Sequence, residues 1–273
     1  MGFVPGFYYK QPGYNRLESR MAGIEYTFKR YEKKFLLNPW QYEELLTGFK
    51  QWMEMDGYGL HTICNIYFDT DNFDLIRASI EKPPYKEKFR LRSYGTPGSD
   101  DNIFAEIKKK YKGIVYKRRI ALKQHEMQYF FSGGEVLREN RQIQREIHWF
   151  FKMYDIKPKV FTGYERTAFT GRDNPGLRIT FDQNIRWRME ELDLCAGDKG
   201  SLVMDDNKIL MEIKFPQAVP LWLASLLSEL KIYPHSFSKY GTCYKKYIAM
   251  DLTHHIKIKQ PVLQEPGKDG DLC

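Results

Sequence analysis

The chain has 273 residues, of which 42% are hydrophobic and 15% aromatic, so it can bury a sizeable core without disulfides or metal ions. These values exclude a largely disordered protein. Lys and Arg number 43 against 35 Asp and Glu, a formal net charge of +8, which indicates an anionic partner without identifying it.

The excess positive charge is concentrated between Lys82 and Lys123. This stretch holds 13 Lys or Arg residues against 4 Asp or Glu residues, so the rest of the chain is close to neutral. The four cysteines are too scattered for a zinc site or a disulfide framework and predict a reduced, cytoplasmic protein. No run of about 18 apolar residues occurs, so we expect no membrane-inserted segment. Work at a membrane would require a partner protein.

We expect residues 1–25 to form a flexible leader, 26–253 a single domain and 254–273 a polar tail. Asn38 followed by Pro39 predicts a helix start, with apolar residues at helical spacing after it. Apolar periodicity and breaking residues predict five helices, at 39–55, 121–131, 135–154, 220–230 and 238–251.

Between these helices, charged residues recur at every second position, a spacing that places them on one face of a strand. Six segments share this pattern: Arg30, Glu32 and Lys34; Arg90 and Arg92; Glu106, Lys108 and Lys110; Lys117 and Arg119; Arg178, Thr180 and Asp182; Glu212 and Lys214. Each predicted strand therefore presents a charged face backed by apolar residues.

Two arrangements fit these strands. They can be ordinary antiparallel strands with one face in water. Alternatively, the helices cover the apolar faces and the charged faces line an antiparallel β-barrel tunnel, an α+β fold with helices packed outside. The density of Arg and Lys favours the tunnel. Because buried cations are costly unless an anion pairs with them, such a lumen is expected to bind a polyanion.

Eight segments, in order, resemble the VTC (vacuolar transporter chaperone) polyphosphate polymerase domain, within the triphosphate tunnel metalloenzyme (CYTH-like) superfamily. They are RYEKKFLL (30–37), NIYFDT (65–70), KFRLRSYG (88–95), FAEIKKKYKGIVYKRRI (104–120), YERTAFTG (164–171), LRITFDQNI (177–185), LMEIKFP (210–216) and FSKY (237–240). The resemblance implies a domain that transfers the γ-phosphate of ATP onto polyphosphate inside a basic tunnel, with Mn²⁺ or Mg²⁺.

Carried over motif by motif, the resemblance implies nine cations that bind phosphate and act in transfer: Lys34, Arg90, Arg92, Lys108, Lys117, Arg166, Arg178, Lys214 and Lys239. Five of them would contact ATP: Arg90, Arg92, Lys108, Arg166 and Arg178. Glu212 matches the metal-coordinating glutamate of the family. The implied partners are ATP and polyphosphate, with no nucleic acid, and oligomeric state stays open.

One departure bears on the reaction. Tunnel hydrolases of the superfamily open with an ExExK strand, whereas this chain has Arg30, Glu32 and Lys34 at the matching positions. A cation in place of the first carboxylate favours holding a long product over activating water. Two alternatives stay open: a tunnel triphosphatase, and a noncatalytic polyphosphate sensor or scaffold.

Several polar residues of these segments are expected to be structural. Asp69 is expected to fix a strand end, and Glu106 to pair with an inner cation rather than bind metal. For Glu32, pairing with an inner cation and binding a metal ion both stay open. Three cations fall on the opposite parity or in a turn and are expected to face solvent: Lys109, Lys112 and Arg118.

Overall fold

The structure is a computed structural model that describes residues 31–112, 114–136, 140–204 and 207–249. Within these residues, ten strands form one antiparallel sheet. Their bounds are β1 Tyr31–Leu37, β2 Met53–Met55, β3 His61–Asp69, β4 Tyr85–Tyr94, β5 Asn102–Tyr111, β6 Ile114–Lys123, β7 Lys157–Gly171, β8 Arg178–Arg188, β9 Ser201–Leu202 and β10 Ile209–Phe215.

The strand order is β1-β10-β8-β7-β3-β4-β5-β6, with β2 added to β7 and β9 added to β8. This arrangement confirms the predicted antiparallel tunnel fold with helices outside it. The sheet curves so that Lys108 on β5 comes within electrostatic reach of Glu32 and Lys34 on β1, although five strands separate β5 from β1 in the order. In the described part of the chain, β1 and β6 end the order and do not pair, so the tunnel wall has a seam.

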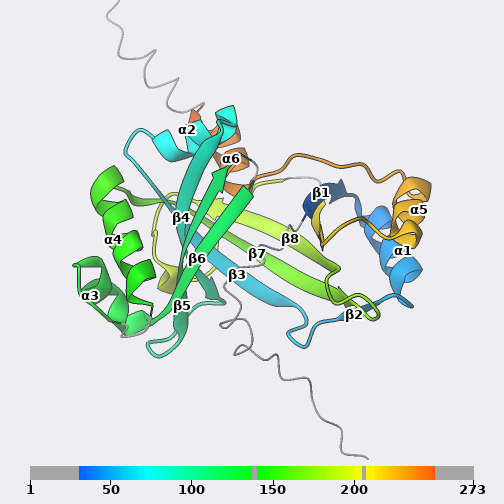
Figure 1. The fold of residues 1–273 in the computed structure, drawn as a ribbon, viewed down its shortest axis with the longest axis horizontal. Helices are drawn as coiled ribbons and strands as arrows, with labels where there is room; N and C mark the ends of the chain where they lie inside the picture. The colour runs from blue at the N-terminus through cyan, green and yellow to red at the C-terminus, as the bar shows by residue number, and fades with distance from the viewer. Residues whose placement is uncertain (1–30, 113, 137–139, 205–206, 250–273) are drawn as a thin grey trace, which may run out of the picture.

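The helices lie around the sheet (Figure 1). They are α1 Pro39–Phe49, α2 Asp74–Glu81, α3 Met127–Phe131, α4 Arg141–Tyr154, α5 Leu221–Glu229 and α6 Lys239–Cys243, with short 3₁₀ turns at Gln124–Glu126 and Leu194–Ala196 and a π-helical turn at Tyr244–Ile248. None of the helices in the described ranges has the length and apolarity that a membrane span requires.

Two hydrophobic clusters cover the outer face of the sheet. Phe89, Leu91 and Ile107 of β4 and β5 pack with Ile147 and Phe150 of α4 in the first cluster. The second joins β1, β8 and β10 to α1 and α5, which lie at the opposite side of the sheet in Figure 1. Because the apolar side of the long strands is used in this way, their charged side is left to face inward.

A third cluster closes one end of the inner side. Phe73 and Ile76, at and just after the start of α2, pack with Tyr240 and Cys243 of α6, and Tyr240 stacks on Tyr67 of β3 with centroids 5.0 Å apart. This packing brings α6 against the inner face. It thereby positions Lys239, the first residue of α6.

Three predicted helices have different bounds in the structure. The first ends at Phe49 rather than at 55, because Met53–Met55 pair with Phe169–Gly171 of β7 and Met53 is buried in the second cluster. Residues 121–123 belong to β6 and pair with 102–104 of β5, so the predicted helix there is reduced to Met127–Phe131. Sheet hydrogen bonds outweigh local helix propensity in both segments. The third begins at Arg141 rather than at 135.

The last two predicted helices are confirmed in position. The apolar one spans Leu221–Glu229 after Pro220, close to the predicted 220–230. The final one starts at Lys239 with Ser238 as its N-cap, and its second part, Tyr244–Ile248, is π-helical. The residues predicted as leader and tail, together with Arg30 and Asp251, lie outside the described ranges, so the predicted domain limits stay predictions.

Candidate active site

Cross-strand pairing places the alternating charged residues of seven strands on one side of the sheet. Lys34 pairs with Glu212, Lys88 with Lys108, and Arg166 with Asp182 in the strand register. We call this side the charged inner face. It comprises Glu32, Lys34, Lys88, Arg90, Arg92, Glu106, Lys108, Lys117, Arg119, Arg166, Arg178, Asp182, Glu212 and Lys214, together with Lys239 of α6.

Glu106 is a buried carboxylate that organises one end of the charged inner face. It lies 2.7 Å from Nη2 of Arg90 and 2.7 Å from Nζ of Lys117, and Arg119 approaches to 3.9 Å. Burial alone would raise the pKa of Glu106, but Arg90, Arg92 and Lys117 outweigh it and lower that pKa to about 2. The predicted pairing of Glu106 with inner cations is confirmed.

Asp182 is the second buried carboxylate. Arg166 donates two hydrogen bonds to it, at 2.6 and 2.8 Å, and Lys239 of α6 pairs with the same carboxylate. Lys239 also lies over the ring of Tyr164, 4.1 Å from its centroid. Burial opposes ionisation of Asp182, but Lys239 and Arg166 lower its pKa. Asp182 therefore holds two predicted phosphate-binding cations in place.

Glu212 lies between two predicted phosphate-binding lysines. Its carboxylate is 2.5 Å from Lys214 and 3.7 Å from Lys34, and Glu32 approaches Lys34 to 3.5 Å. Burial opposes ionisation, but Lys214 and Lys34 hold the pKa of Glu212 well below its usual range. The carboxylate is thus charged at neutral pH.

These residues fit a divalent ion only in part. The described residues contain no group of three His, Cys, Asp or Glu side chains placed to share one metal. Glu212 nevertheless offers carboxylate oxygens beside the phosphate-binding lysines, and Mg²⁺ is commonly held by one or two carboxylates plus substrate phosphates and water. The donor set therefore suits an ion that arrives with a phosphate ligand.

Arg90 and Arg92 are fixed by neutral groups as well. Nη1 of Arg90 donates to the hydroxyl of Tyr67 at 3.3 Å, and Nε of Arg92 donates to Oδ1 of the buried Asn65 at 2.9 Å. Arg92 also reaches the hydroxyl of Tyr164. These contacts hold the planar guanidinium groups in one orientation, which suits two-pronged binding of phosphate oxygens.

Two lysines at the centre differ from these anchored cations. Neither Lys88 nor Lys108 forms an ion pair with a described carboxylate. Burial, followed by repulsion from Lys108 and Arg90, lowers the pKa of Lys88 from 10.5 to about 7. Burial also lowers the pKa of Lys108, with Glu32 opposing the shift and Lys34 adding to it. The fold thus leaves two lysines, without an ion-paired carboxylate among the described residues, between its paired clusters.

The structure brings the predicted phosphate-binding cations and Glu212 together on the charged inner face. Arg178 lies at the edge of this face. Arg178 shares the inner side with Lys214, but its side chain is 48% exposed and pairs with Asp56 at 3.3 Å. Lys88 was missed, although its period-two spacing from Arg90 was sufficient to find it. Lys109, expected to face solvent, lies on the outer side and pairs with Glu146 of α4 at 2.7 Å.

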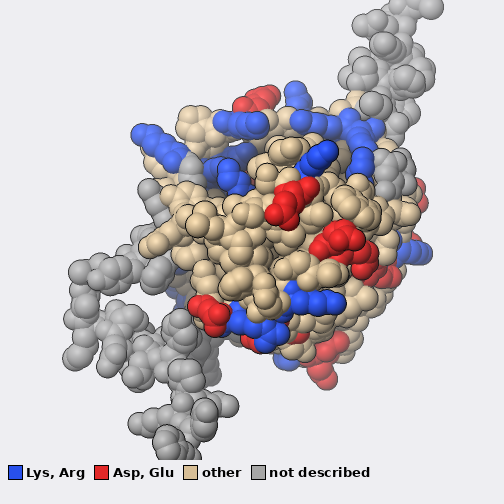
Figure 2. All heavy atoms as spheres, turned by 90° about the vertical axis from the view of Figure 1, so that its right-hand side faces the viewer, with Lys and Arg blue, Asp and Glu red and all other residues tan. Residues whose placement is uncertain are grey.

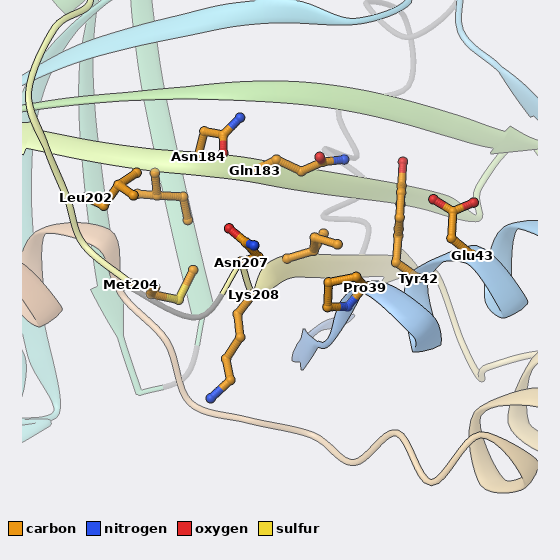
Figure 3. Close-up of a pocket in the computed structure, with 11 residues that line it drawn as sticks. Pro39, Tyr42, Glu43, Gln183, Asn184, Leu202, Met204, Asn207 and Lys208 are labelled. Atoms are coloured by element: carbon orange, nitrogen blue, oxygen red, sulfur yellow. The ribbon is translucent and has the colours of Figure 1, made fainter.

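The outer surface carries both signs of charge on the side of α1 and α5. Lys and Arg of the described residues gather along the upper edge and again in the lower part of this face, and clusters of Asp and Glu lie in its middle (Figure 2). A separate pocket of about 230 Å³ lies between β8, β10 and α1 (Figure 3). Gln183, Asn184 and Asn207 are among the residues that line it, and it lacks the cation density of the charged inner face.

Residues 29–248 match the family described as the VTC domain. Similar curated proteins include the vacuolar transporter chaperone complex subunit 4 of Trypanosoma cruzi, 27% identical over 167 residues, which are 50% of this chain and 20% of that protein. The subunit of the same name in Schizosaccharomyces pombe is 25% identical over 215 residues, 66% of this chain and 29% of that protein. The matches thus span less than a third of these relatives.

Similar solved structures have lower identity. A Hippeastrum protein named as an adenylyl cyclase, with a dominant triphosphatase activity, is 18% identical at a TM-score of 0.46 and covers 77% of this chain and 92% of its own. A mimivirus capping-enzyme triphosphatase is 9% identical at a TM-score of 0.31, over 73% of this chain and 88% of its own.

Proposed function

The chain belongs to the VTC domain family, and on this premise we propose that it is a polyphosphate polymerase domain that transfers the γ-phosphate of ATP onto a growing polyphosphate chain. The observation that supports this most is the pair of inner lysines without carboxylate partners, Lys88 and Lys108, set between three clusters in which Glu106, Asp182 and Glu212 hold the other cations. A linked row of phosphates supplies the missing negative charge.

The proposed transfer needs positioning and charge neutralisation more than covalent work by the protein. An oxygen of the terminal phosphate of the acceptor attacks the γ-phosphorus, and the bond from the γ-phosphorus to the β,γ-bridging oxygen breaks. ADP leaves with the electron pair of that bond. Because the attacking oxygen is already anionic near neutral pH, no strong general base is required. Arg90, Arg92 and Arg166, held by their partners, would orient the phosphates in line.

We propose Glu212 as the protein ligand of Mn²⁺ or Mg²⁺, with phosphate oxygens and water completing the shell. Such an ion supplies neutralisation of the charge that develops on nonbridging oxygens. Lys34 and Lys214 flank the same carboxylate, so they would bind the phosphate that shares the ion.

A tunnel triphosphatase is the second candidate, and the pairing of the carboxylates argues against it. Hydrolysis needs a group that accepts a proton from water. On the charged inner face, as far as the structure describes it, each carboxylate is within ion-pair distance of Lys or Arg. Because Glu106 has a pKa of about 2, it is a poor proton acceptor at neutral pH.

The first prediction is the reaction itself. Purified protein incubated with ATP, Mn²⁺ and a short polyphosphate primer should form chains that resist nuclease and are digested by a polyphosphatase. Glu212→Gln should lower the rate by at least tenfold while binding of tripolyphosphate is largely kept, because the substitution removes the proposed metal ligand and leaves the cations. Release of free phosphate from tripolyphosphate without chain growth would instead assign the triphosphatase, and binding without any product would assign the sensor.

The relatives are named as subunits of a chaperone complex. We propose that this domain also works beside partner subunits, which would receive the product. Co-purification from its own cells with proteins that remain associated in high salt tests this, and a domain recovered only alone would contradict it.

A further inference from the structure

Four aromatic rings lie in sequence at one end of the charged inner face, and we call them the aromatic rim: Tyr58, His61, Tyr94 and Phe104. The ring centroids are 6.1 Å apart from Tyr58 to His61, 5.9 Å from His61 to Tyr94 and 5.7 Å from Tyr94 to Phe104. Tyr94 shares strand parity with Arg92 and Arg90, and His61 pairs in register with Arg166. The rim therefore adjoins the proposed phosphate-binding cations.

Core packing does not account for these rings. None of the four belongs to the three buried clusters found among the described residues. The side chain of Tyr94 is 52% exposed and that of Tyr58 is 82% exposed. The four rings meet at interplanar angles of 65°, 52° and 82°, so they support one another edge to face rather than as one flat platform. The exposed faces of Tyr58 and Tyr94 are therefore the ones on which a flat ligand can stack.

Arg119 connects the aromatic rim to the charged inner face, because its side chain contacts residues of both. Its guanidinium carbon lies 4.3 Å from the centroid of Phe104, and the same side chain approaches Glu106 to 3.9 Å. Along β4, Tyr94 is two residues from Arg92 and four from Arg90, which at about 3.3 Å per residue places its Cα about 13 Å from that of Arg90. A ribose and an extended triphosphate span a distance of this order.

We propose that the aromatic rim stacks the base of the nucleoside triphosphate donor, while the charged inner face holds its phosphates. This inference rests on the proposed function and adds the part of the substrate that the rim recognises. Stacking on aromatic rings is tolerant of base identity. We therefore expect ATP and GTP to bind with similar affinity. Both should bind more tightly than tripolyphosphate when the affinities are compared at a pH at which the ligands carry the same net charge.

Binding measurements separate the two parts of the site. By titration calorimetry, Tyr94→Ala should raise the Kd of a nonhydrolysable ATP analogue about tenfold and leave the Kd of tripolyphosphate within twofold. Tyr94→Phe keeps the ring and should behave as the unaltered protein. Phe104→Leu removes the ring that supports Tyr94 edge to face and should also weaken the analogue selectively. Tyr129→Ala is the matched control, because Tyr129 is 61% exposed on α3 and is not one of the four rings of the rim.

The readout does not depend on turnover. If Tyr94→Ala and Phe104→Leu weaken both ligands equally, or neither, the rim does not hold the base and the inference is overturned. If the selective loss is seen but no polyphosphate is formed, the proposed polymerase activity fails while base stacking stands. Melting temperatures of the variants, measured without ligand, show whether each one is folded.

Discussion

Lys88 is the residue that indicates most directly that the charged inner face binds a polyanion. It lies on the same side as Arg90 and Lys108 and has no carboxylate partner in the part of the chain that the structure describes. Burial and its cationic neighbours lower its pKa from 10.5 to about 7, so the side chain is largely neutral at pH 8. A bound polyanion reverses this balance, because it favours the charged lysine.

Proton uptake on binding follows from that shift. At pH 8, tripolyphosphate binding should take up about one proton as Lys88 becomes charged, and the uptake should vanish well below pH 7, where the lysine is already protonated. Calorimetry in two buffers with different ionisation enthalpies measures it. Lys88→Met should reduce the uptake, whereas Lys110→Met, at an exposed position of the neighbouring strand, should not. Equal uptake in both variants would contradict the assignment.

The same group makes the stability of the phosphate-free protein depend on pH. Between pH 7 and 10.5 the unfolded chain keeps the proton of Lys88 while the folded protein has lost it, so the free energy of unfolding rises with pH over this window. Lys88→Met should make that rise smaller in urea unfolding curves recorded at pH 7 and pH 9.5. A rise of the same size, or a steeper one, in the variant would exclude this explanation.

At the scale of the elements, Asp69 joins two helices to the end of β3. Its carboxylate accepts hydrogen bonds from the backbone N–H of Thr70, Leu75 and Ile76 and from the hydroxyl of Tyr240. The expectation that Asp69 fixes a strand end is confirmed. Because Tyr240 follows Lys239 in α6, the same carboxylate also helps to position a cation of the inner face.

Removing this junction should destabilise the protein without touching the phosphate site directly. Asp69→Ala leaves several buried donors without an acceptor and should lower the free energy of unfolding by about 3–5 kcal/mol, and Tyr240→Phe by about 1.5–3 kcal/mol. Asp71→Asn weakens the pairs of the exposed Asp71 with Lys157 and Lys159 and should cost under about 1 kcal/mol. Denaturant unfolding measures all three, and equal losses for Asp69 and Asp71 would contradict the role of Asp69.

For the whole molecule, the curvature of the sheet concentrates cations whose mutual repulsion opposes folding. A polyanion relieves this repulsion and binds only the folded state. At 100 times its Kd, tripolyphosphate should therefore add about 2.7 kcal/mol to the free energy of unfolding, seen as a higher melting temperature. Longer polyphosphates should be effective at lower concentration than tripolyphosphate, and added salt should weaken the effect because it screens the exposed cations.

Controls separate this effect from nonspecific attraction to a basic protein. Adenosine, which lacks phosphates, should cause no comparable shift, and duplex DNA should not displace tripolyphosphate from an inward-facing site. Stabilisation by DNA equal to that by polyphosphate would place the relevant cations on an outer surface.

The sequence by itself determined which side chains share a face. In a strand, residues two apart point the same way, so the alternation of Arg90 with Arg92 and of Glu212 with Lys214 could be interpreted without coordinates. The apolar residues at the other, alternate positions of these strands predicted that helices cover the outer side of the sheet. Lys88 obeys the same rule, since it lies two residues before Arg90 on β4.

Only the tertiary structure decided which charges meet. Glu106 pairs with Lys117 from the adjacent strand, but Asp182 pairs with Lys239, 57 residues away, because α6 docks against the inner face. The length of the first helix was decided in the same way, since Met53 joins β7 rather than extending the helix. Local periodicity reports the direction of a side chain, whereas its partners, its burial and its pKa depend on chain segments that only folding brings together.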